Sequence, residues 1–423
     1  MAGERRSVFA PIRALGSALK HEGAYELTRK FWCAVRREGI RPAFDRLRIY
    51  KQRLGEERDI AVSDPSEERE VLFVSACPGG TRRYRCLHAI ESLAGVGLAA
   101  DMICFPARSP DAWLDSSRAI VLQRVPVDAR VRALCETAGK RGIRTIFDLD
   151  DLLFDPEHVQ ELDAGIFGSP FEREWARDHA IRIGEALALC DEVTVSTESL
   201  RAAVSERFDH ASVTVLPNVV SARMLQDFDA AIVDDVPSPR VRIGFFSGTP
   251  THDDALASIA PALDRVLSMR PEVELVLTGP VTLPATLAAH ESRVVRQPLF
   301  AADEYPRALR GVDIHLAPLR DCRFDVAKSA LKWLEASLVG RPLVASRRGE
   351  YEAHVEDERT GRLCGTQDEW ANAVLSLVDD PARRTRIGDA ARAEVRSSWT
   401  TTAMSSAWAD ILGRQNADVT ARK

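Results

Sequence analysis

The stretch DIHLAPLRDCRFDVAKSALKWLEASLVGRPLVAS, residues 313–346, joins a short apolar run to a helix-like segment and then to a second apolar run. Its ends, 313–317 and 342–345, predict strands, and the periodicity between them predicts a helix from about Ala327. A strand, a helix and a second strand in this order are typical of a parallel sheet with crossover helices. The stretch therefore predicts an α/β fold.

The same alternation continues in both directions and divides into two groups. Residues 229–240 separate the groups and read as a linker, because they hold two prolines and few large apolar side chains. We expect an N-terminal Rossmann-like unit at 66–228 and a second at 241–400, facing each other across a cleft lined by the carboxyl ends of their strands. A C-terminal helix and tail, 401–423, follow and can return to the first unit. The remaining expected strands are 71–75, 100–105, 119–123, 145–149, 192–196 and 212–216 in the first unit, and 241–246, 273–278 and 293–296 in the second.

Composition excludes several classes of protein. Of the 423 residues, 45% are hydrophobic and 28% are charged, which is close to the average of globular proteins. A chain of this length is too long for one ordinary hydrophobic core, so we expect two domains. The net charge of -6 argues against a general nucleic-acid binder. No apolar run approaches the roughly 18 to 20 residues of a membrane-spanning helix, so we expect a cytoplasmic protein. The eight cysteines form no CxxC pair, which predicts neither a zinc site nor a disulfide framework.

The N-terminal segment 1–65 reads as helical and is locally basic. Residues 1–60 hold fourteen Lys and Arg against eight Asp and Glu, a balance of +6, with aromatic residues interspersed. Such a segment is suited to lie on an anionic membrane at its inner face. The alternative is a solvated helical hairpin packed on the first unit. Both interpretations remain open at this point.

The helix predicted from Ala327 carries charges at a regular spacing. Lys328, Lys332 and Glu335 recur at intervals of four and three, so they share a face or its edge. A helix start with two cations suits a diphosphate, and a carboxylate further along suits ribose hydroxyls. The alternative is an amphipathic helix with an ordinary salt bridge between lysine and glutamate.

The turn after the first strand of the second unit is rich in small residues. Ser247, Gly248 and Thr249 follow that strand, and His252 lies at the start of the next helix. Small residues let backbone amides approach a phosphate closely. The alternative is an ordinary strand-to-helix turn, since many Rossmann-like units have Gly and Ser at this place.

Two further constellations belong to the first unit. The loop after its first strand contains Gly79 and Gly80, with Arg82 and Arg85 entering the following helix, and it is suited to receive an acceptor that carries phosphate. No GKS or GKT follows, so it is not a P-loop. The alternative is a turn with solvated arginines.

The second constellation, TIFDLDDLLF at 145–154, places Asp148, Asp150 and Asp151 at the carboxyl end of an apolar strand. The cluster permits a Mg²⁺ or Mn²⁺ site, a contact with the reacting sugar or acceptor, or a helix cap with a surface acid. The second α/β unit, with its own nucleotide-binding pattern, argues against the metal site.

The stretch 313–346 resembles the donor-binding region of family 4 glycosyltransferases, which are retaining enzymes of the GT-B fold. Their usual pattern is Glu, seven residues, Glu-Ala, then Gly-x-Pro and a strand. Here Glu335 and Ala336 match the second acid, and 340–346 matches the turn and strand. Ala327 stands where the first acid is expected, followed by Lys328 and Ser329. This Lys-Ser form is similar to a subset found in polysaccharide and O-antigen biosynthesis.

The resemblance implies transfer of a sugar from a nucleotide sugar to a cell-surface polysaccharide or lipid-linked glycan, with retention, no metal and no cofactor. It assigns the catalytic roles to Asp150, Asp151, Lys328 and Glu335. Glu335 would bind the ribose, and Lys328 would replace the missing acid as a phosphate contact. The implied donor-binding set is Ser247, Gly248, Thr249, His252, Lys328, Ser329, Lys332 and Glu335, and the acceptor-binding set is Gly79, Gly80, Arg82 and Arg85.

Two other functions stay open. A nucleotide-sugar epimerase shares the two-domain architecture. A non-catalytic partner subunit would explain why Ala327 replaces the first acid.

Overall fold

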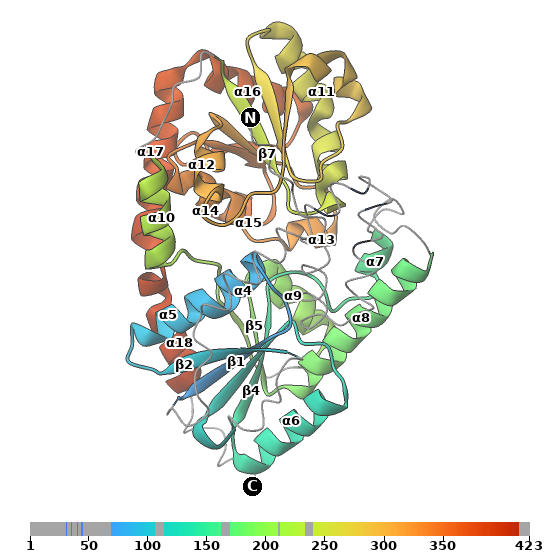
Figure 1. Cartoon of the computed structure of the whole chain (residues 1–423), viewed down its shortest axis with the longest axis vertical. Helices are drawn as coiled ribbons and strands as arrows, with labels where there is room; N and C mark the ends of the chain where they lie inside the picture. Colours follow the sequence, from blue (N-terminus) through green and yellow to red (C-terminus); the bar gives the residue numbers. More distant parts are fainter. Residues whose placement is uncertain are drawn as a thin grey trace, which may run out of the picture.

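The computed structural model describes residues 69–105, 114–161, 170–209, 212–232 and 240–413, with four single positions, 31, 35, 40 and 44, before them. They form two α/β units, the first below the second in Figure 1. The N-terminal segment 1–65 lies outside the described residues apart from those four positions. Its helical character and its contact with a membrane therefore stay predictions.

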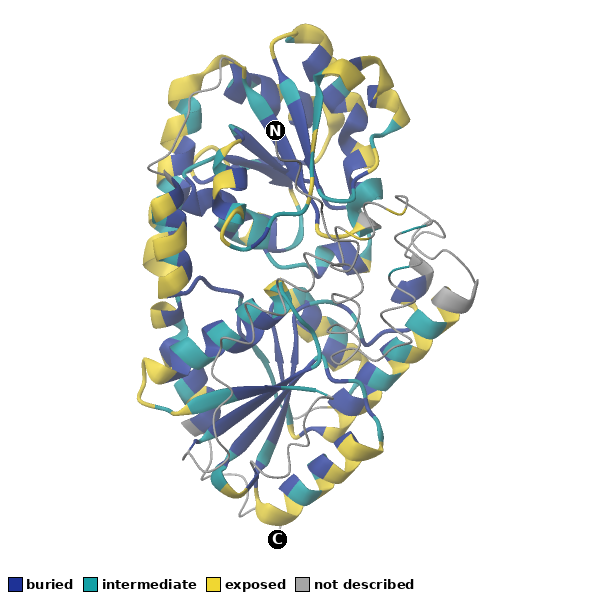
Figure 2. Cartoon of the chain, viewed as in Figure 1, coloured by how far each residue is buried: buried dark blue, intermediate teal, exposed yellow. Residues whose placement is uncertain are grey.

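The first unit is built on a six-stranded parallel sheet in the order β2-β1-β3-β4-β5-β6. The residues of its central strands β1, β3 and β4 are almost all buried, as expected for a parallel sheet covered on both faces (Figure 2). The strands are β1 (Val71–Ser75), β2 (Ala100–Cys104), β3 (Ala119–Gln123), β4 (Arg144–Leu149), β5 (Glu192–Val195) and β6 (Val213–Val215).

The second unit has a parallel sheet in the order β12-β11-β10-β7-β8-β9. Read from the other edge, this is the doubly wound order 3-2-1-4-5-6 of the unit's own strands. The strands are β7 (Arg242–Phe246), β8 (Glu274–Thr278), β9 (Val294–Gln297), β10 (Ile314–Ala317), β11 (Leu343–Ser346) and β12 (Arg362–Cys364).

The strand predictions are confirmed. Each of the eleven expected strands is present, with ends that agree to within one residue. The sequence did not predict β12, which has three residues and includes Arg362. The α/β fold with two Rossmann-like units is therefore the observed one.

Helices connect the strands and cover both sheets, with their outer faces exposed in Figure 2. In the first unit they are α4 (Gly80–Arg82), the π-helix η1 (Arg83–Leu87), α5 (His88–Ala94), α6 (Ala129–Arg141), α7 (His158–Glu161), α8 (Pro170–Leu189) and α9 (Glu198–Arg207). From there on they are α10 (Ala222–Ile232), η3 (Pro250–His252), α11 (Asp253–Met269), η4 (Ala285–Arg293), α12 (Tyr305–Arg310), α13 (Arg323–Val326), α14 (Leu331–Leu338), α15 (Gly349–His354), α16 (Gln367–Asp379), α17 (Pro381–Ser398) and α18 (Thr401–Gly413).

The helix α10 differs from the expected domain boundary. The expected linker 229–240 begins inside α10, and the described part of that range includes the last turn of this helix. Met224 and Phe228 are buried in the same cluster as Trp333 of α14, so α10 packs on the second unit. Because α10 packs on the second unit, the chain passes from the first unit to the second before Ala222 and not within the expected linker 229–240.

The chain returns to the first unit near its end. The backbones of Val220 and Thr400 form a parallel bridge, so the outgoing and returning segments run side by side. After this bridge α18 packs against α5 (Figure 1). The centres of the Trp408 and Phe73 rings lie 5.7 Å apart. The last described helix thus completes the core of the first unit.

Candidate active site

Sheet topology indicates where each unit can bind a ligand. In open α/β sheets, ligands bind at the carboxyl ends of strands where the strand order reverses direction. This point lies between β7 and β10 in the second unit and between β1 and β3 in the first. The residues that follow these four strands include most of the candidates named from the sequence.

The turn after β7 brings Ser247 and His252 together. The Ser247 hydroxyl lies 2.7 Å from Nδ1 of His252 and also donates to the carbonyl oxygen of Thr249 at 2.6 Å. Burial lowers the pKa of His252 well below its usual value, and the charges of Lys332 and Lys328 lower it further. The imidazole is therefore neutral near pH 7 and offers polar contacts without a charge.

Gly279, at the end of β8, supports this turn and was not predicted from the sequence. Its φ is +92°, and a Cβ at this position would lie 1.9 Å from the carbonyl oxygen of Ser247. Only glycine fits that close approach without a shift of the backbone. Gly248 is exposed, and a Cβ there would meet no atom within 4 Å. Gly279 thus shapes the turn, whereas Gly248 leaves space beside it.

The helix expected from Ala327 is wrong in its extent. The structure has a short helix, α13, that ends at Val326, and α14 begins only at Leu331. The first unit binds the intervening segment: the Thr197 hydroxyl donates to the Ala327 carbonyl oxygen at 3.1 Å, and the Asn218 amide donates to the Ser329 hydroxyl at 2.9 Å. These contacts between the units replace hydrogen bonds that a continuous helix would make.

Lys328 lies in this interruption and is paired. Its ammonium group donates to Asp325 at 2.6 Å and lies 4.8 Å from the centre of the Phe324 ring. Burial alone would raise the pKa of Asp325, but hydrogen bonds from Arg320 and Lys328, with the charge of Lys328, outweigh it and hold that pKa at about 2. Asp325 is therefore a buried carboxylate that orients Lys328 and Arg320.

Lys332 and Glu335 lie on α14, one turn apart. The Lys332 ammonium lies 4.6 Å from the centre of the Phe245 ring. Burial, with the charge of Lys328 beside it, lowers the pKa of Lys332 to about 8. The charges of Lys328 and Lys332 thus both act on His252 in the turn after β7, although the three residues do not share a single helix face.

Both carboxylate oxygens of Glu335 accept hydrogen bonds from tyrosines. Tyr305 donates to Oε2 at 2.8 Å, and Tyr84, from the π-helix of the first unit, donates to Oε1 at 3.1 Å. Burial raises the pKa of Glu335, and the two hydroxyls oppose this rise. The sequence did not predict Tyr84 at this site, although a polar aromatic residue between Arg83 and Arg85 was a visible signal.

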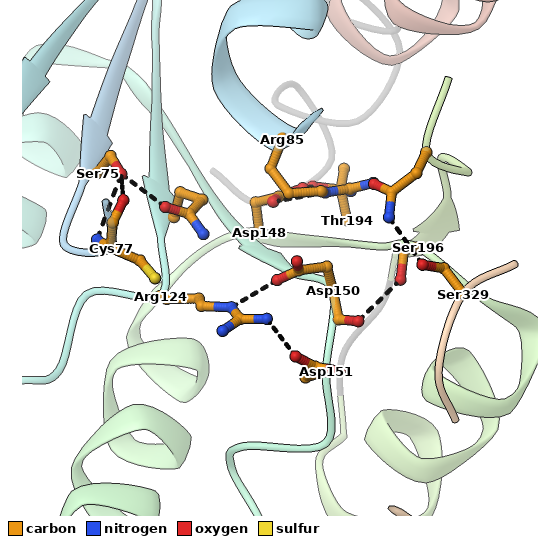
Figure 3. Close-up of polar contacts among 12 residues, drawn as sticks. Ser75, Cys77, Arg85, Arg124, Asp148, Asp150, Asp151, Thr194, Ser196 and Ser329 are labelled. Carbon is orange, nitrogen blue, oxygen red and sulfur yellow. Dashed lines mark hydrogen bonds and ion pairs between the residues drawn. The ribbon is translucent and has the colours of Figure 1, made fainter. Parts of the chain in front are cut away.

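Asp148 and Arg85 form a buried ion pair inside the first unit (Figure 3). Two nitrogens of Arg85 donate to the two oxygens of Asp148, at 2.9 and 2.6 Å, and Thr194 donates to the same carboxylate at 2.7 Å. The third nitrogen of Arg85 donates to the Leu216 carbonyl oxygen at 2.6 Å and to Asn218. The guanidinium is only 3% exposed, so it stabilises the crossover segment rather than an open acceptor loop.

Asp150 and Asp151 share a partner that the sequence did not predict. Nε of Arg124 donates to Asp150 at 2.5 Å and Nη2 donates to Asp151 at 2.6 Å (Figure 3). Arg124 directly follows β3, and this position, a charged residue at the end of a buried strand, was the signal available in the sequence. The two acids and the arginine therefore form one cluster at the carboxyl ends of β3 and β4.

The remaining acceptor candidates follow β1. Gly79 has φ +80° and caps α4, and a Cβ at Gly80 would meet no atom within 4 Å. Arg82 is buried, and its Nε donates to the Ser75 hydroxyl at 3.2 Å. The structure thus brings Gly79 and Gly80 to the open side of the loop, while Arg82 and Arg85 lie within the unit.

The acidic side chains at 148–151 are paired with arginines in the structure. Both oxygens of Asp148 accept hydrogen bonds from Arg85, one of them also from Thr194, and Arg124 forms an ion pair with each of Asp150 and Asp151. Across the described ranges, no group of three His, Cys, Asp or Glu side chains is arranged to hold a metal. In the same part of the chain, no helix combines the length and apolar character needed to cross a bilayer.

Part of the chain matches a known family model. Residues 240–380 match the model described as "Glycosyl transferases group 1". This range contains the turn after β7, the 327–330 segment and α14, so it covers all the donor-side candidates.

Curated relatives are similar to parts of the chain. The GDP-mannose-dependent monoacylated alpha-(1-6)-phosphatidylinositol monomannoside mannosyltransferase of Corynebacterium glutamicum is 26% identical over 233 residues, which are 52% of this chain and 60% of the relative. The GDP-mannose-dependent alpha-(1-6)-phosphatidylinositol monomannoside mannosyltransferase of Mycobacterium tuberculosis is 28% identical over 167 residues, 38% of this chain and 43% of the relative. The chain therefore matches 60% or less of the length of each of these relatives.

Solved structures share the architecture over most of the chain. Anabaena HepE in complex with UDP has a TM-score of 0.55 at 16% identity, and it covers 82% of this chain and 100% of its own. Sucrose-phosphate synthase from Thermosynechococcus elongatus has a TM-score of 0.57 at 15% identity, with 82% and 99% covered. WaaG, a glycosyltransferase involved in lipopolysaccharide biosynthesis, has a TM-score of 0.53 at 14% identity, with 81% and 100% covered.

These likenesses, with the two parallel sheets, show the GT-B fold. The expected fold class is confirmed. The second unit also carries the group 1 glycosyl transferase model.

Proposed function

We propose that this chain is a glycosyltransferase that moves a sugar from a nucleotide donor to a glycan or lipid-linked glycan, with retention of configuration. The observation that carries the proposal is that the family match at 240–380 contains Lys328 and Lys332, whose charges act on His252 beside the β7–β10 switch point. Departure of a nucleoside diphosphate builds negative charge, and cations placed beside it stabilise the transition state. Lys328 and Lys332 supply such cations near the turn after β7.

The donor site takes its parts from three segments. The turn Ser247–Gly248–Thr249, with neutral His252, contacts the diphosphate together with Lys328, Ser329 and Lys332. Glu335 binds the ribose, because its carboxylate already accepts hydrogen bonds from two hydroxyl groups. The Lys-Ser form of the motif is part of this proposal, with Asp325 buried beneath Lys328 as the acid that orients it.

The acceptor side lies in the first unit. Asp150 or Asp151 contacts the reacting sugar or orients the acceptor hydroxyl, and Gly79 and Gly80 leave room for the acceptor. Arg82 and Arg85 act within the unit, since their nitrogens bind Ser75 and Asp148. The two relatives named above are GDP-mannose-dependent phosphatidylinositol monomannoside mannosyltransferases, so GDP-mannose is the first donor to test. The basic segment 1–65 would bring the enzyme to an anionic membrane surface.

A nucleotide screen tests the proposal. Melting temperatures are measured with GDP, UDP, dTDP and the corresponding nucleotide sugars. A ligand at 100 times its dissociation constant adds about 2.7 kcal/mol to the free energy of unfolding. We expect one nucleotide and its sugar to stabilise the protein. Stabilisation by none of them would contradict the proposal, and a new nucleotide sugar formed without acceptor would indicate an epimerase.

Glu335→Gln tests the placement of the donor. Loss of a charge-assisted hydrogen bond should weaken nucleotide binding by about ten- to a hundredfold. Glu352→Gln, at an exposed position of the same unit, is the matched control and should bind as the parent does. If a folded Glu335→Gln protein binds and transfers like the parent, the donor is not bound at α14.

A further inference from the structure

The cluster of Arg124, Asp150 and Asp151 has a geometry that an internal ion pair does not need. Arg124 donates one hydrogen bond to each acid, rather than two to one acid as Arg85 does to Asp148. Consequently one oxygen of each carboxylate is left over. Among the residues that the structure describes, neither Oδ2 of Asp150 nor Oδ1 of Asp151 accepts a hydrogen bond.

The backbone of Arg124 is held in an uncommon conformation. Its φ is +52°, in the left-handed region that residues other than glycine rarely occupy. Such a conformation costs about 1 to 3 kcal/mol and persists only where the surroundings enforce it. Here the Arg124 amide donates to the Asp148 carbonyl oxygen at 3.2 Å, and Val125 beside it is fully buried. Glycine would adopt this turn with less strain, so the guanidinium is the reason for an arginine at this position.

The cluster lies within electrostatic reach of the second unit. Burial raises the pKa of Asp151, and the charges of Arg124 and of Lys328, from the second unit, oppose this rise. Asp148, the neighbouring acid on the strand, accepts hydrogen bonds from Arg85 at both of its oxygens. Two acids with a single arginine leave a net negative charge, which suits hydroxyl groups better than phosphate.

We infer that Arg124 is a positioning residue, whose fork holds Asp150 and Asp151 side by side and turns one free oxygen of each toward substrate hydroxyl groups. The inference rests on the proposed function and names the chemistry of its acceptor side as a neutral polyol. Without the guanidinium, two carboxylates close together in a partly buried site repel each other, and one of them takes up a proton. Loss of Arg124 should therefore change the pH dependence of the reaction as well as its rate.

The test compares Arg124→Gln and Arg124→Lys with the parent. Hydrolysis of GDP-mannose, or of whichever nucleotide sugar stabilises the parent, is measured from pH 5.5 to pH 9, and binding of the nucleoside diphosphate is measured alongside. For Arg124→Gln we expect diphosphate affinity within about twofold of the parent, and a fall in rate between pH 8 and pH 6 that is about tenfold larger than in the parent. Arg124→Lys, which keeps the charge, should recover part of the difference. Arg132→Gln, which removes an exposed arginine paired with Glu185, is the control.

Two results would overturn the inference. One is a folded Arg124→Gln protein whose pH profile parallels that of the parent, and the other is an Arg124→Lys protein no better than Arg124→Gln. If Arg124→Gln does not fold, the same comparison is made between Arg124→Lys and the parent. If the parent binds no nucleotide, the proposed function fails, and ¹³C-carboxyl NMR titration still decides on Arg124. In that titration Arg124→Gln must raise the pKa of one of the two acids, and unchanged values would refute the positioning role.

Discussion

Tyr84 and Glu335 are 251 residues apart in the sequence, and the Tyr84 hydroxyl donates a hydrogen bond to Oε1 of Glu335 at 3.1 Å. The two residues belong to different units, so the proposed ribose-binding acid is also a contact between the units. Tyr84 lies on a π-helix, a rare element that occurs frequently at functional sites. A donor bound at Glu335 as proposed would therefore act on the hydrogen bond that Tyr84 makes.

Tyr84→Phe should make donor binding more sensitive to acid. Burial raises the pKa of Glu335, and the hydroxyls of Tyr305 and Tyr84 lower it. Without the Tyr84 hydroxyl the pKa rises further, so the ionised form needed for ribose binding is lost at a higher pH. We expect the loss of nucleotide affinity relative to the parent to be larger at pH 6 than at pH 8, in titration calorimetry.

Tyr305→Phe removes the other hydroxyl and should act in the same direction. An equal loss of affinity at both pH values would instead indicate that the tyrosines shape the site without tuning Glu335.

Donor turnover should not need a divalent metal. The proposed diphosphate position has Lys328 and Lys332 beside it, while Asp150 and Asp151 are both paired with Arg124. With EDTA in excess, we expect the rate of GDP-mannose hydrolysis to stay within about twofold of the rate measured without EDTA. Complete loss of activity, restored by Mn²⁺, would return the acidic cluster to a role as a metal site.

Much of the fold was visible in the sequence because its causes are local. Continuous apolar runs such as 71–75 and 119–123 are long enough to identify buried strands, and the strands found there have those bounds. β12 was missed because its three residues carry only two buried side chains.

The site was less predictable because its causes lie far apart in the sequence. The interruption of the helix at 327–330 depends on Thr197 and Asn218 of the other unit, which no periodicity within 313–346 can reveal. Similarly, Arg85 was expected to bind an acceptor because its partner Asp148 lies 63 residues away, where no local pattern connects the two. The types of residue were predicted, and their partners were not.

Gly279→Ala should destabilise the protein and disturb the turn Ser247–Gly248–Thr249 after β7. Its Cβ would lie 1.9 Å from the Ser247 carbonyl oxygen, and its φ of +92° is unfavourable for alanine. We expect the free energy of unfolding to fall by about 1 to 3 kcal/mol or more, measured by urea denaturation.

Gly248→Ala is the matched control for stability, because its Cβ would meet no atom within 4 Å. Its unfolding curve should overlay that of the parent, while nucleotide binding should weaken because the methyl group occupies the space proposed for the diphosphate. Parent-like binding by Gly248→Ala would move the diphosphate away from this turn.

Lys332→Met should stabilise the protein and weaken donor binding at the same time. Burial and the charge of Lys328 lower the pKa of Lys332 to about 8, below its usual value of 10.5. A lowered pKa in a cation means that its charged form is disfavoured in the folded state. The penalty is fully present below about pH 8 and declines as the pH rises from there toward the usual value of 10.5. At pH 7 the methionine variant should therefore melt at a higher temperature than the parent, and at pH 9 the difference should shrink.

Diphosphate affinity should change in the opposite direction. In the parent it should decline as the pH rises past the point where Lys332 loses its proton, whereas the variant should bind weakly at every pH. Lys332→Arg keeps the charge to higher pH, so its affinity should persist at pH 9 if the guanidinium fits beside Phe245. Calorimetric titration with GDP and UDP at pH 7 and pH 9, together with melting temperatures at both, measures the two effects on the same samples. A Lys332→Met protein that binds nucleotide as tightly as the parent would show that this cation does not contact the diphosphate, and Lys328 would then be the only lysine proposed for that role.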